Sequence, residues 1–362
     1  MSKRVFIAAT KQNDGKTTVA LGLIFNLQKR FKNIGFIKPI GQRYLEEDGL
    51  KVDEDSLLIE KVGKACGIKC GLKDMSPVAV EKGFTEKYLL KPDKGEITRH
   101  IKESFRRIKK NQEMVIIEGT GHAGVGSVFD HSNAYVAKLL HSKVVIISSG
   151  GIGRPIDEIL LNRALFEKEG VKLAGVIINK VLPEKFDKIN KLVREGLKRK
   201  GIEVLGVIPY HPELSYPTIR QILEETDFKL LCAENALENR VAKIVVGAMQ
   251  PKDAVKYFVD QFLLITPGDR LDILNSALEF QDKDSRISGI ILTGGFSVEK
   301  ELLDTFASRN IPVLFSKSDT YTVASLVHDL TVKIQPQDKE KIDIIVKLIA
   351  DYVDIDKFLK AI

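Results

Sequence analysis

The chain has 362 residues, of which 44% are hydrophobic and 29% are charged. This composition excludes an intrinsically disordered protein, and no apolar run approaches the roughly 20 residues that a membrane-spanning helix needs. The formal net charge is +7, yet the lysines are dispersed among acidic residues, which is typical of a solvated surface rather than a nucleic-acid patch. The 3 cysteines are a sparse set that favours a reducing compartment. We therefore expect a cytoplasmic protein with no membrane and no nucleic-acid partner.

Strand and helix patterns alternate along the first part of the chain. Short apolar runs predict buried strands, and longer stretches with apolar residues at helical spacing predict helices. The predicted strands cover residues 5–9, 34–39, 115–117, 144–148, 174–179 and 204–208, and the predicted helices cover 15–31, 97–108, 156–169 and 185–200. Such alternation is typical of an α/β fold with a mostly parallel sheet and helices on both faces.

A proline-bearing segment, residues 209–217, interrupts this alternation. Residues 219–226 predict a helix that leads outward from it. A second α/β set begins near residue 228, with strands predicted at 244–247, 262–266, 287–292 and 313–315 and helices at 251–259, 270–279, 299–308 and 321–328. Residues 338–349 predict a final amphipathic helix. We therefore expect two domains, a larger one over residues 1–222 and a smaller α/β domain over residues 223–362.

The segment between the first strand and the first helix carries Gly15-Lys16-Thr17-Thr18. A glycine, a lysine and a hydroxyl residue that follow a strand and open a helix are typical of a phosphate-binding loop, or P-loop. Lys16 would neutralise phosphate oxygens, and the Thr17 hydroxyl would ligate Mg²⁺. We expect this loop to bind ATP with Mg²⁺, through nucleotide contacts from Lys11, Asn13, Gly15, Lys16, Thr17 and Thr18.

Polar side chains near two other strands are candidates for the same site. Glu118 directly follows the strand 115–117, and the carboxyl ends of parallel strands line the ligand crevice of such a sheet. Asp55 is a second candidate metal ligand, with Asp53 and Glu54 as alternatives and an acidic helix start as the simpler explanation. Lys38 lies at the end of the second strand, from which a lysine reaches an anionic substrate.

Five motifs follow one another along the first part of the chain: Gly15-Lys16-Thr17, Ile37-Lys38-Pro39, Asp55-Ser56-Leu57, Glu118-Gly119-Thr120-Gly121 and Asn179-Lys180. In this order they resemble the motifs of dethiobiotin synthetase and the related cobyrinic acid amide synthases. The resemblance implies a P-loop domain that binds ATP, with Mg²⁺ held by Thr17, Asp55 and Glu118. It also implies that Lys38 contacts the substrate and Asn179 the adenine. Lys16, Lys38 and Glu118 would then be the catalytic residues.

A second resemblance extends over the whole chain and depends on residues 118–130, Gly268-Asp269-Arg270 and Leu292-Thr293-Gly294-Gly295. These segments resemble the N-terminal regulatory part of long phosphate acetyltransferases, in which a dethiobiotin-synthetase-like domain is joined to a DRTGG domain. Only the first two residues of the name-giving run, Asp269 and Arg270, match here. We expect no acetyl-transferring domain in this chain, and therefore no acetyltransferase activity by itself.

These features leave three hypotheses for the function. The first is a nucleotide-dependent regulatory or metabolic ATPase, in which ATP and a small anionic ligand change assembly or partner binding. The second is an ATP-dependent ligase that activates a small carboxylate or carbamate, with Lys16 and Lys38 stabilising the developing charge. The third is a partition-type ATPase, in which Lys11 reaches the phosphates of a partner subunit; the alternative is that Lys11 is a surface lysine beside an anion site. We expect a homo-oligomer, in the form of a dimer.

Two loops of the second domain are candidates for the anionic ligand. Arg270 and the pair Gly294-Gly295 each follow a predicted apolar strand, at the edge where ligands bind in a parallel sheet. Arg270 would clamp a phosphate or carboxylate with two hydrogen bonds. The alternative is that Asp269 caps a helix and Arg270 pairs with a neighbouring acid.

Overall fold

The computed structural model describes residues 2–64, 68, 70–281 and 286–362, and the chain separates into two compact units. The first unit comprises Met1–Tyr210 together with Ile334–Ile362, and the second comprises His211–Lys333. Each unit contains a sheet of its own. Within the described ranges, no helix is long and apolar enough to cross a membrane.

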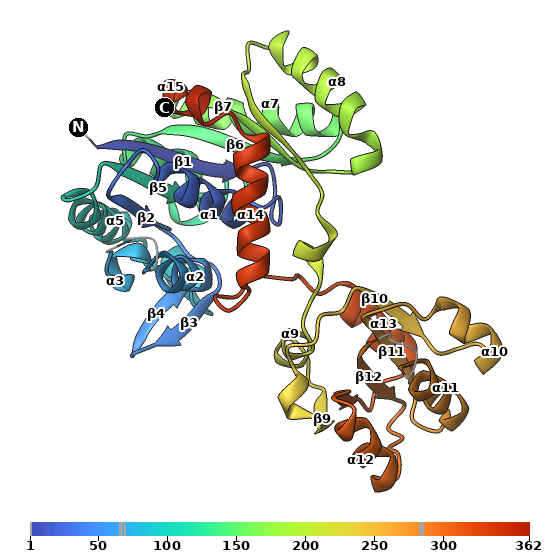
Figure 1. Cartoon of the computed structure of the whole chain (residues 1–362). Helices are drawn as coiled ribbons and strands as arrows, with labels where there is room; N and C mark the ends of the chain where they lie inside the picture. Colours follow the sequence, from blue (N-terminus) through green and yellow to red (C-terminus); the bar gives the residue numbers. More distant parts are fainter. Residues whose placement is uncertain (1, 65–67, 69, 282–285) are drawn as a thin grey trace. The chain divides into compact units, whose positions relative to one another are not determined.

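The first unit contains a six-stranded sheet in which every neighbouring pair is parallel (Figure 1). The central strands are buried along most of their length, as expected for a parallel sheet with helices on both faces. In spatial order the strands are β2 (Ile34–Ile37), β5 (Met114–Glu118), β1 (Lys3–Ala9), β6 (Lys143–Ser149), β7 (Leu173–Val181) and β8 (Val204–Pro209). The predicted mostly parallel α/β fold is confirmed.

Helices connect and flank these strands: α1 (Lys16–Leu27), α5 (Lys94–Lys109), α6 (Asn133–Leu139), α7 (Gly153–Lys168) and α8 (Phe186–Lys198). Between β2 and β5 the chain also forms an antiparallel hairpin of β3 (Tyr44–Glu47) and β4 (Leu50–Asp53), followed among the described residues by the helices α2 (Glu54–Gly63), α3 (Leu72–Met75) and α4 (Phe84–Leu90). The apolar pattern used above does not predict this hairpin, because its strands are only four residues long; the turn pair Asp48-Gly49, with φ values of 49° and 75°, is the signal that indicates it. The hairpin positions the site, since β4 ends directly at the start of α2.

The last segment of the chain returns to the first unit. There α14 (Lys339–Tyr352) packs against α1. Nδ2 of Asn26 donates hydrogen bonds of 2.9 Å to the carbonyl oxygens of Gly22 and Val346, one on each helix. A Cβ added at Gly22 would lie 2.3 Å from Cγ1 of Ile349, so the two helices approach closely at this glycine.

The structure therefore divides the chain differently from the expected domains 1–222 and 223–362, since residues 334–362 belong to the first unit. After α14, Val353 forms an isolated antiparallel bridge with Gly206 of β8, and α15 (Ile355–Ala361) follows. From sequence alone, the apolar side of this amphipathic segment fits either unit. Its burial against α1 decides between them.

The second unit contains a five-stranded sheet, in the spatial order β10 (Lys243–Val246), β11 (Phe262–Pro267), β12 (Ile287–Thr293), β13 (Val313–Phe315) and β9 (Lys229–Cys232). The first four strands are parallel, and β9 is an antiparallel edge strand that the sequence pattern does not predict. Successive residues of β11 alternate between two apolar clusters, one on each face of the sheet. The helices are α9 (Ile219–Glu224), α10 (Pro251–Ala254), α11 (Leu271–Gln281), α12 (Lys300–Ser308) and α13 (Thr320–His328). The expected second, smaller α/β domain is confirmed.

Candidate functional site

The loop between β1 and α1 depends on a glycine. Gly15 precedes the first turn of α1 and has a φ of 95°, a conformation that L-residues with a side chain disfavour. A Cβ at this position would also lie 2.3 Å from Nδ2 of Asn179. Both the conformation and the available space therefore require glycine, and β7, which carries Asn179, lies directly against the loop.

Asp14 is the buried centre of this loop, with 1% of its surface exposed. Its carboxylate accepts hydrogen bonds from Oγ1 of Thr10 at 2.7 Å, from the backbone N–H of Lys11 at 3.0 Å and from Oγ of Ser149 at 2.8 Å. Its carbonyl oxygen accepts a fourth hydrogen bond, from Nδ2 of Asn179 at 2.9 Å. Protein groups thus hold the loop in shape. The P-loop pattern does not identify Asp14, because one of its partners, Ser149, lies on a different strand.

The remaining loop residues surround this buried centre. Asn13 is exposed with a φ of 62°, and its carbonyl oxygen accepts a hydrogen bond of 2.8 Å from Nζ of Lys180. Lys11 and Thr18 are half-buried on either side of the loop. The contacts of Asn13, Lys11 and Thr18 with a nucleotide stay predictions.

Lys16 and Thr17 begin α1 next to Glu118, the last residue of β5. Oγ1 of Thr17 donates a hydrogen bond of 2.8 Å to Oε1 of Glu118. Burial lowers the pKa of the Lys16 ammonium, although the nearby Glu118 carboxylate opposes that shift. Glu118 itself is fully buried, and burial raises the pKa of its carboxyl group to about 7. A carboxylate with so little access to water requires a cation or hydrogen-bond donors close by.

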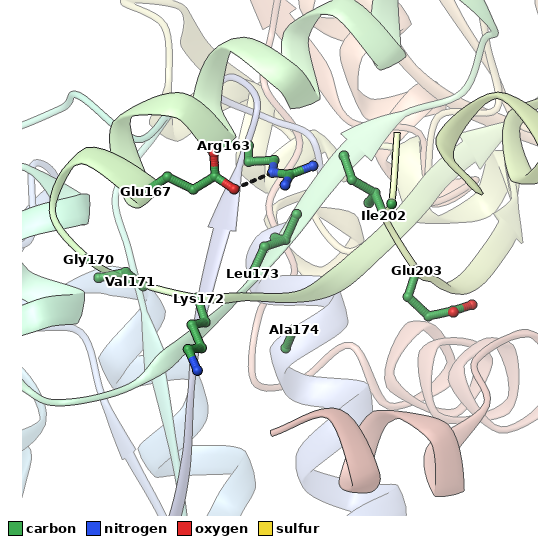
Figure 2. Close-up of a pocket in the computed structure, with 10 residues that line it drawn as sticks. Arg163, Glu167, Gly170, Val171, Lys172, Leu173, Ala174, Ile202 and Glu203 are labelled. Atoms are coloured by element: carbon green, nitrogen blue, oxygen red, sulfur yellow. Dashed lines mark hydrogen bonds and ion pairs between the residues drawn. The ribbon is translucent and has the colours of Figure 1, made fainter. Parts of the chain in front are cut away.

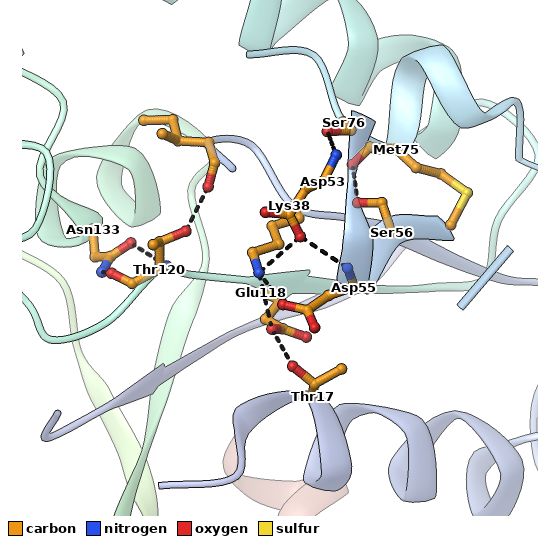
Figure 3. A network of polar contacts seen from close by, with 11 residues as sticks. Thr17, Lys38, Asp53, Asp55, Ser56, Met75, Ser76, Glu118, Thr120 and Asn133 are labelled. Carbon is orange, nitrogen blue, oxygen red and sulfur yellow. Dashed lines mark hydrogen bonds and ion pairs between the residues drawn. The ribbon is translucent and has the colours of Figure 1, made fainter. Parts of the chain in front are cut away.

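Lys38 is buried among three carboxylates, of which Asp53 and Glu118 are also buried (Figure 3). Its Nζ is 2.9 Å from Oδ1 of Asp53 and 3.7 Å from Oε1 of Glu118, and it forms a shorter contact with Oδ2 of Asp55. Burial by itself would lower the pKa of Lys38, but the three carboxylates outweigh it and hold that pKa above its ordinary value. Lys38 in turn holds the pKa of Asp55 below its usual range, against the effect of burial.

Several backbone segments position this group. Lys38 directly follows β2, and its backbone N–H donates a hydrogen bond of 2.8 Å to the carbonyl oxygen of Met75. Asp53, the last residue of β4, caps α2 by accepting a hydrogen bond of 3.0 Å from the backbone N–H of Asp55. The backbone N–H of Asp53 donates one of 2.8 Å to Oγ of Ser76. The hairpin and the start of α2 thus turn both aspartates towards the same lysine (Figure 3).

The structure brings together the residues that the motifs placed in one site: Lys16, Thr17, Lys38, Asp55 and Glu118. Asp53, an alternative to Asp55 from sequence alone, joins them, because both carboxylates contact Lys38. Asn179 contacts the P-loop rather than this group. The chemical role of each residue stays a prediction.

In the second unit, Arg270 is already engaged by protein groups. Its Nε and Nη2 donate hydrogen bonds of 2.9 Å to the two carboxylate oxygens of Asp272. Nη1 and Nη2 also donate to the carbonyl oxygens of Gly247 and Met249, at 3.3 and 3.0 Å. The structure therefore shows pairing with a neighbouring acid, the alternative to an anion clamp.

The glycine pair at the same edge of the second sheet is engaged as well. The backbone N–H groups of Gly294 and Gly295 donate hydrogen bonds of 2.8 and 3.1 Å to the carbonyl oxygens of Ser318 and Ser316. These two donors join the loops after β12 and β13. The anionic ligand expected for this unit stays a prediction.

A separate pocket of about 440 Å³ lies at the amino-terminal ends of β7 and β8 (Figure 2). Nε of Arg163 pairs with Oε1 of Glu167 at 2.6 Å on its wall, and Nη1 of Arg163 donates to the carbonyl oxygen of Lys200 at 2.8 Å. The P-loop lies at the carboxyl ends of the strands, so this pocket is not part of the site described above.

Two known protein families match this chain. Residues 3–218 match the AAA domain family, over more than half of the sequence. The chain belongs to this family. Residues 221–330 match the DRTGG domain, so an AAA domain is followed by a DRTGG domain. The family match and the strand–loop–helix around Lys16 identify the first unit as a P-loop domain of the ATPase type.

The AAA domain and the DRTGG domain occur together in known relatives. Phosphate acetyltransferases of Pseudomonas putida and Pseudomonas aeruginosa are 27% and 25% identical to this chain over 96% and 97% of its length. The match covers 50% and 51% of those proteins, so the chain spans about half their length. The resemblance to part of the phosphate acetyltransferases, inferred above from motifs, is confirmed.

Among solved structures, the septum site-determining protein MinD of Pyrococcus horikoshii, complexed with Mg-ADP, is similar to part of this chain. It is 16% identical with a TM-score of 0.36, over 59% of this chain and 84% of that protein. The assignment to the P-loop ATPase type depends on the family match and on the loop, not on this similarity.

Proposed function

We propose that the AAA domain binds Mg-ATP at its P-loop and acts as a nucleotide-dependent regulatory or metabolic ATPase of the dethiobiotin synthetase type. The observation that carries the proposal is the hydrogen bond of 2.8 Å from Thr17 to Glu118, beside the buried ammonium of Lys16. A hydroxyl, a carboxylate and a lysine at the head of a helix are the groups with which P-loop proteins bind a metal and phosphates. Backbone N–H groups at the start of α1 would supply further phosphate contacts.

The residues around Thr17 fit a magnesium ion. Oε2 of Glu118 is buried and has no hydrogen-bond partner among the described residues. Those residues contain no group of three His, Cys, Asp or Glu side chains that forms a metal site by itself. Mg²⁺ takes one or two carboxylates and completes its shell with water and substrate phosphates, so it does not need such a group. Thr17, Asp55 and Glu118 would hold the ion, which would neutralise charge on the phosphate oxygens.

Other contacts of the nucleotide follow from the position of the loop. Asn179 lies against the loop at Gly15, which supports a contact with the adenosine part of ATP. Lys11 is half-buried in the P-loop. In a homodimer, its ammonium would contact the phosphates bound by the partner subunit. A small anionic ligand of the DRTGG domain would then act together with ATP.

An ATP-dependent ligase that activates a small carboxylate or carbamate is the second candidate function. The observation in its favour is the ammonium of Lys38, which lies 3.7 Å from Glu118, close to where the phosphates would be. The same ammonium also contacts Asp53 and Asp55. An anionic acceptor would therefore have to displace carboxylates from Lys38, which favours the regulatory ATPase.

Thermal unfolding with and without Mg-ATP tests the proposed function. A ligand at about 100 times its dissociation constant stabilises the folded state by about 2.7 kcal/mol. Lys16→Ala should abolish this stabilisation, because the phosphates lose their buried cation. Lys188→Ala, at an exposed position on α8, is the matched control and should keep it. Equal stabilisation of the Lys16→Ala variant and the wild type would disprove the P-loop proposal.

A further inference from the structure

The ammonium of Lys38 contacts the two carboxylates that would hold the metal. Its Nζ contacts Oδ2 of Asp55 and lies 3.7 Å from Oε1 of Glu118 (Figure 3). A divalent cation bound by these carboxylates and an ammonium in the same place would repel each other at close range. Lys38 and the metal therefore compete for Asp55 and Glu118.

Without a cation, this group of carboxylates would be strongly destabilising. The side chains of Asp53, Asp55 and Glu118 are 2%, 19% and 0% exposed. Buried carboxylates that share one site raise each other's energy unless a positive charge lies between them. Lys38, whose own side chain is 7% exposed, supplies that charge.

Asp53 differs from the other two carboxylates. Its Oδ1 lies 2.9 Å from Nζ of Lys38 and accepts the backbone N–H of Asp55 at 3.0 Å. Thr17 donates to Glu118, at the end of the group closest to the P-loop. A cation that takes Asp55 and Glu118 therefore leaves Lys38 a partner that it already contacts, so that a small movement of the ammonium suffices.

We propose that Lys38 is a built-in counter-cation: it occupies the metal position between Asp55 and Glu118 until a divalent cation arrives, and it then pairs with Asp53 alone. This inference depends on the proposed function, because it assumes that Asp55 and Glu118 hold a metal. The exchange weakens the binding of a cation by itself. The phosphates of a nucleotide supply the missing negative charge, so cation and nucleotide bind together.

Binding of Mn²⁺ to the nucleotide-free protein, followed by electron paramagnetic resonance, tests the proposal. Lys38→Met removes the competitor and should tighten Mn²⁺ binding by about tenfold or more. Asp53→Asn removes the carboxylate with which the displaced Lys38 ammonium would pair, and should therefore weaken Mn²⁺ binding. Lys188→Met, at the exposed position on α8, is the control for the loss of a lysine and should bind Mn²⁺ as the wild type does.

The double variant Lys38→Met/Asp53→Asn decides between competition and a simple effect of net charge. It has the same net charge as the wild type and loses the carboxylate of Asp53 together with the ammonium, so it is less destabilised than Lys38→Met alone. Competition predicts that the double variant binds Mn²⁺ more tightly than the wild type. Equal or weaker binding by the double variant would overturn the proposal.

The Mn²⁺ and Mg-ATP experiments together distinguish a failure of the exchange by Lys38 from a failure of the proposed nucleotide binding. Tighter Mn²⁺ binding by the double variant, without any stabilisation of the wild type by Mg-ATP, would support the exchange and reject nucleotide binding. Stabilisation by Mg-ATP that depends on Lys16, with unchanged Mn²⁺ binding by the double variant, would reject only the exchange.

Discussion

Ile345→Ala should destabilise the first unit and leave the second unit unchanged. Ile345 lies on α14 and is 0% exposed, and its Cγ2 would lie 3.1 Å from a Cβ added at Gly22 of α1. Truncation of a fully buried isoleucine loses buried apolar surface and leaves a cavity, which together cost about 2–5 kcal/mol. The whole penalty should fall on the first unit, because α14 packs there.

Hydrogen–deuterium exchange at several urea concentrations measures the opening free energy of each unit separately. Peptides from β1 and β5 should exchange roughly 30-fold faster or more, since each 1.36 kcal/mol corresponds to about tenfold. Peptides from β11 and β12 should be unchanged. Ile265→Ala, at a fully buried position on β11, is the matched control and should give the reverse pattern. Faster exchange of β11 and β12 in the Ile345→Ala variant, or no change anywhere, would refute the placement of α14.

Further changes test the P-loop and the second unit. Gly15→Ala should abolish the heat of Mg-ATP binding in a calorimetric titration. The added Cβ would collide with Asn179, and the φ of 95° costs alanine about 1–2 kcal/mol. Thr218→Ala removes the capping box of α9 and should lower the free energy of unfolding of the second unit in urea by about 1 kcal/mol. Arg270→Ala should speed hydrogen exchange in residues 247–250 without weakening nucleotide binding. Weaker binding would instead support an anion clamp.

The positions of several site residues could be predicted from the sequence, because they follow from the order of strands and helices in a parallel sheet. Apolar runs identify β1 and β5, and the residues directly after or at the end of such strands lie at one edge of the sheet. Glu118 and the P-loop were therefore expected to lie together, and the hydrogen bond from Thr17 to Glu118 agrees with this. Lys38 follows from the same rule, since it comes directly after β2.

Other features depend on contacts that no local pattern encodes. Asp14 binds Thr10, Lys11 and Ser149, and the last of these lies on a different strand. Asp53 pairs with Lys38 because a hairpin positions it there, and the turn pair Asp48-Gly49 indicates that hairpin but not which lysine Asp53 contacts. The destination of α14 was also undetermined, because an amphipathic helix shows that a face is buried but not against what.

The return of α14 to α1 makes the second unit an insertion within the first, which constrains the order of events during synthesis. The ribosome makes residues 211–333 before α14, so the surface of α1 around Gly22 has no α14 to pack against in that interval. The second unit is complete by then and is free to fold as an independent body. The first unit is finished only when α14 emerges, so an interrupted chain would carry a folded insert on an open, aggregation-prone host.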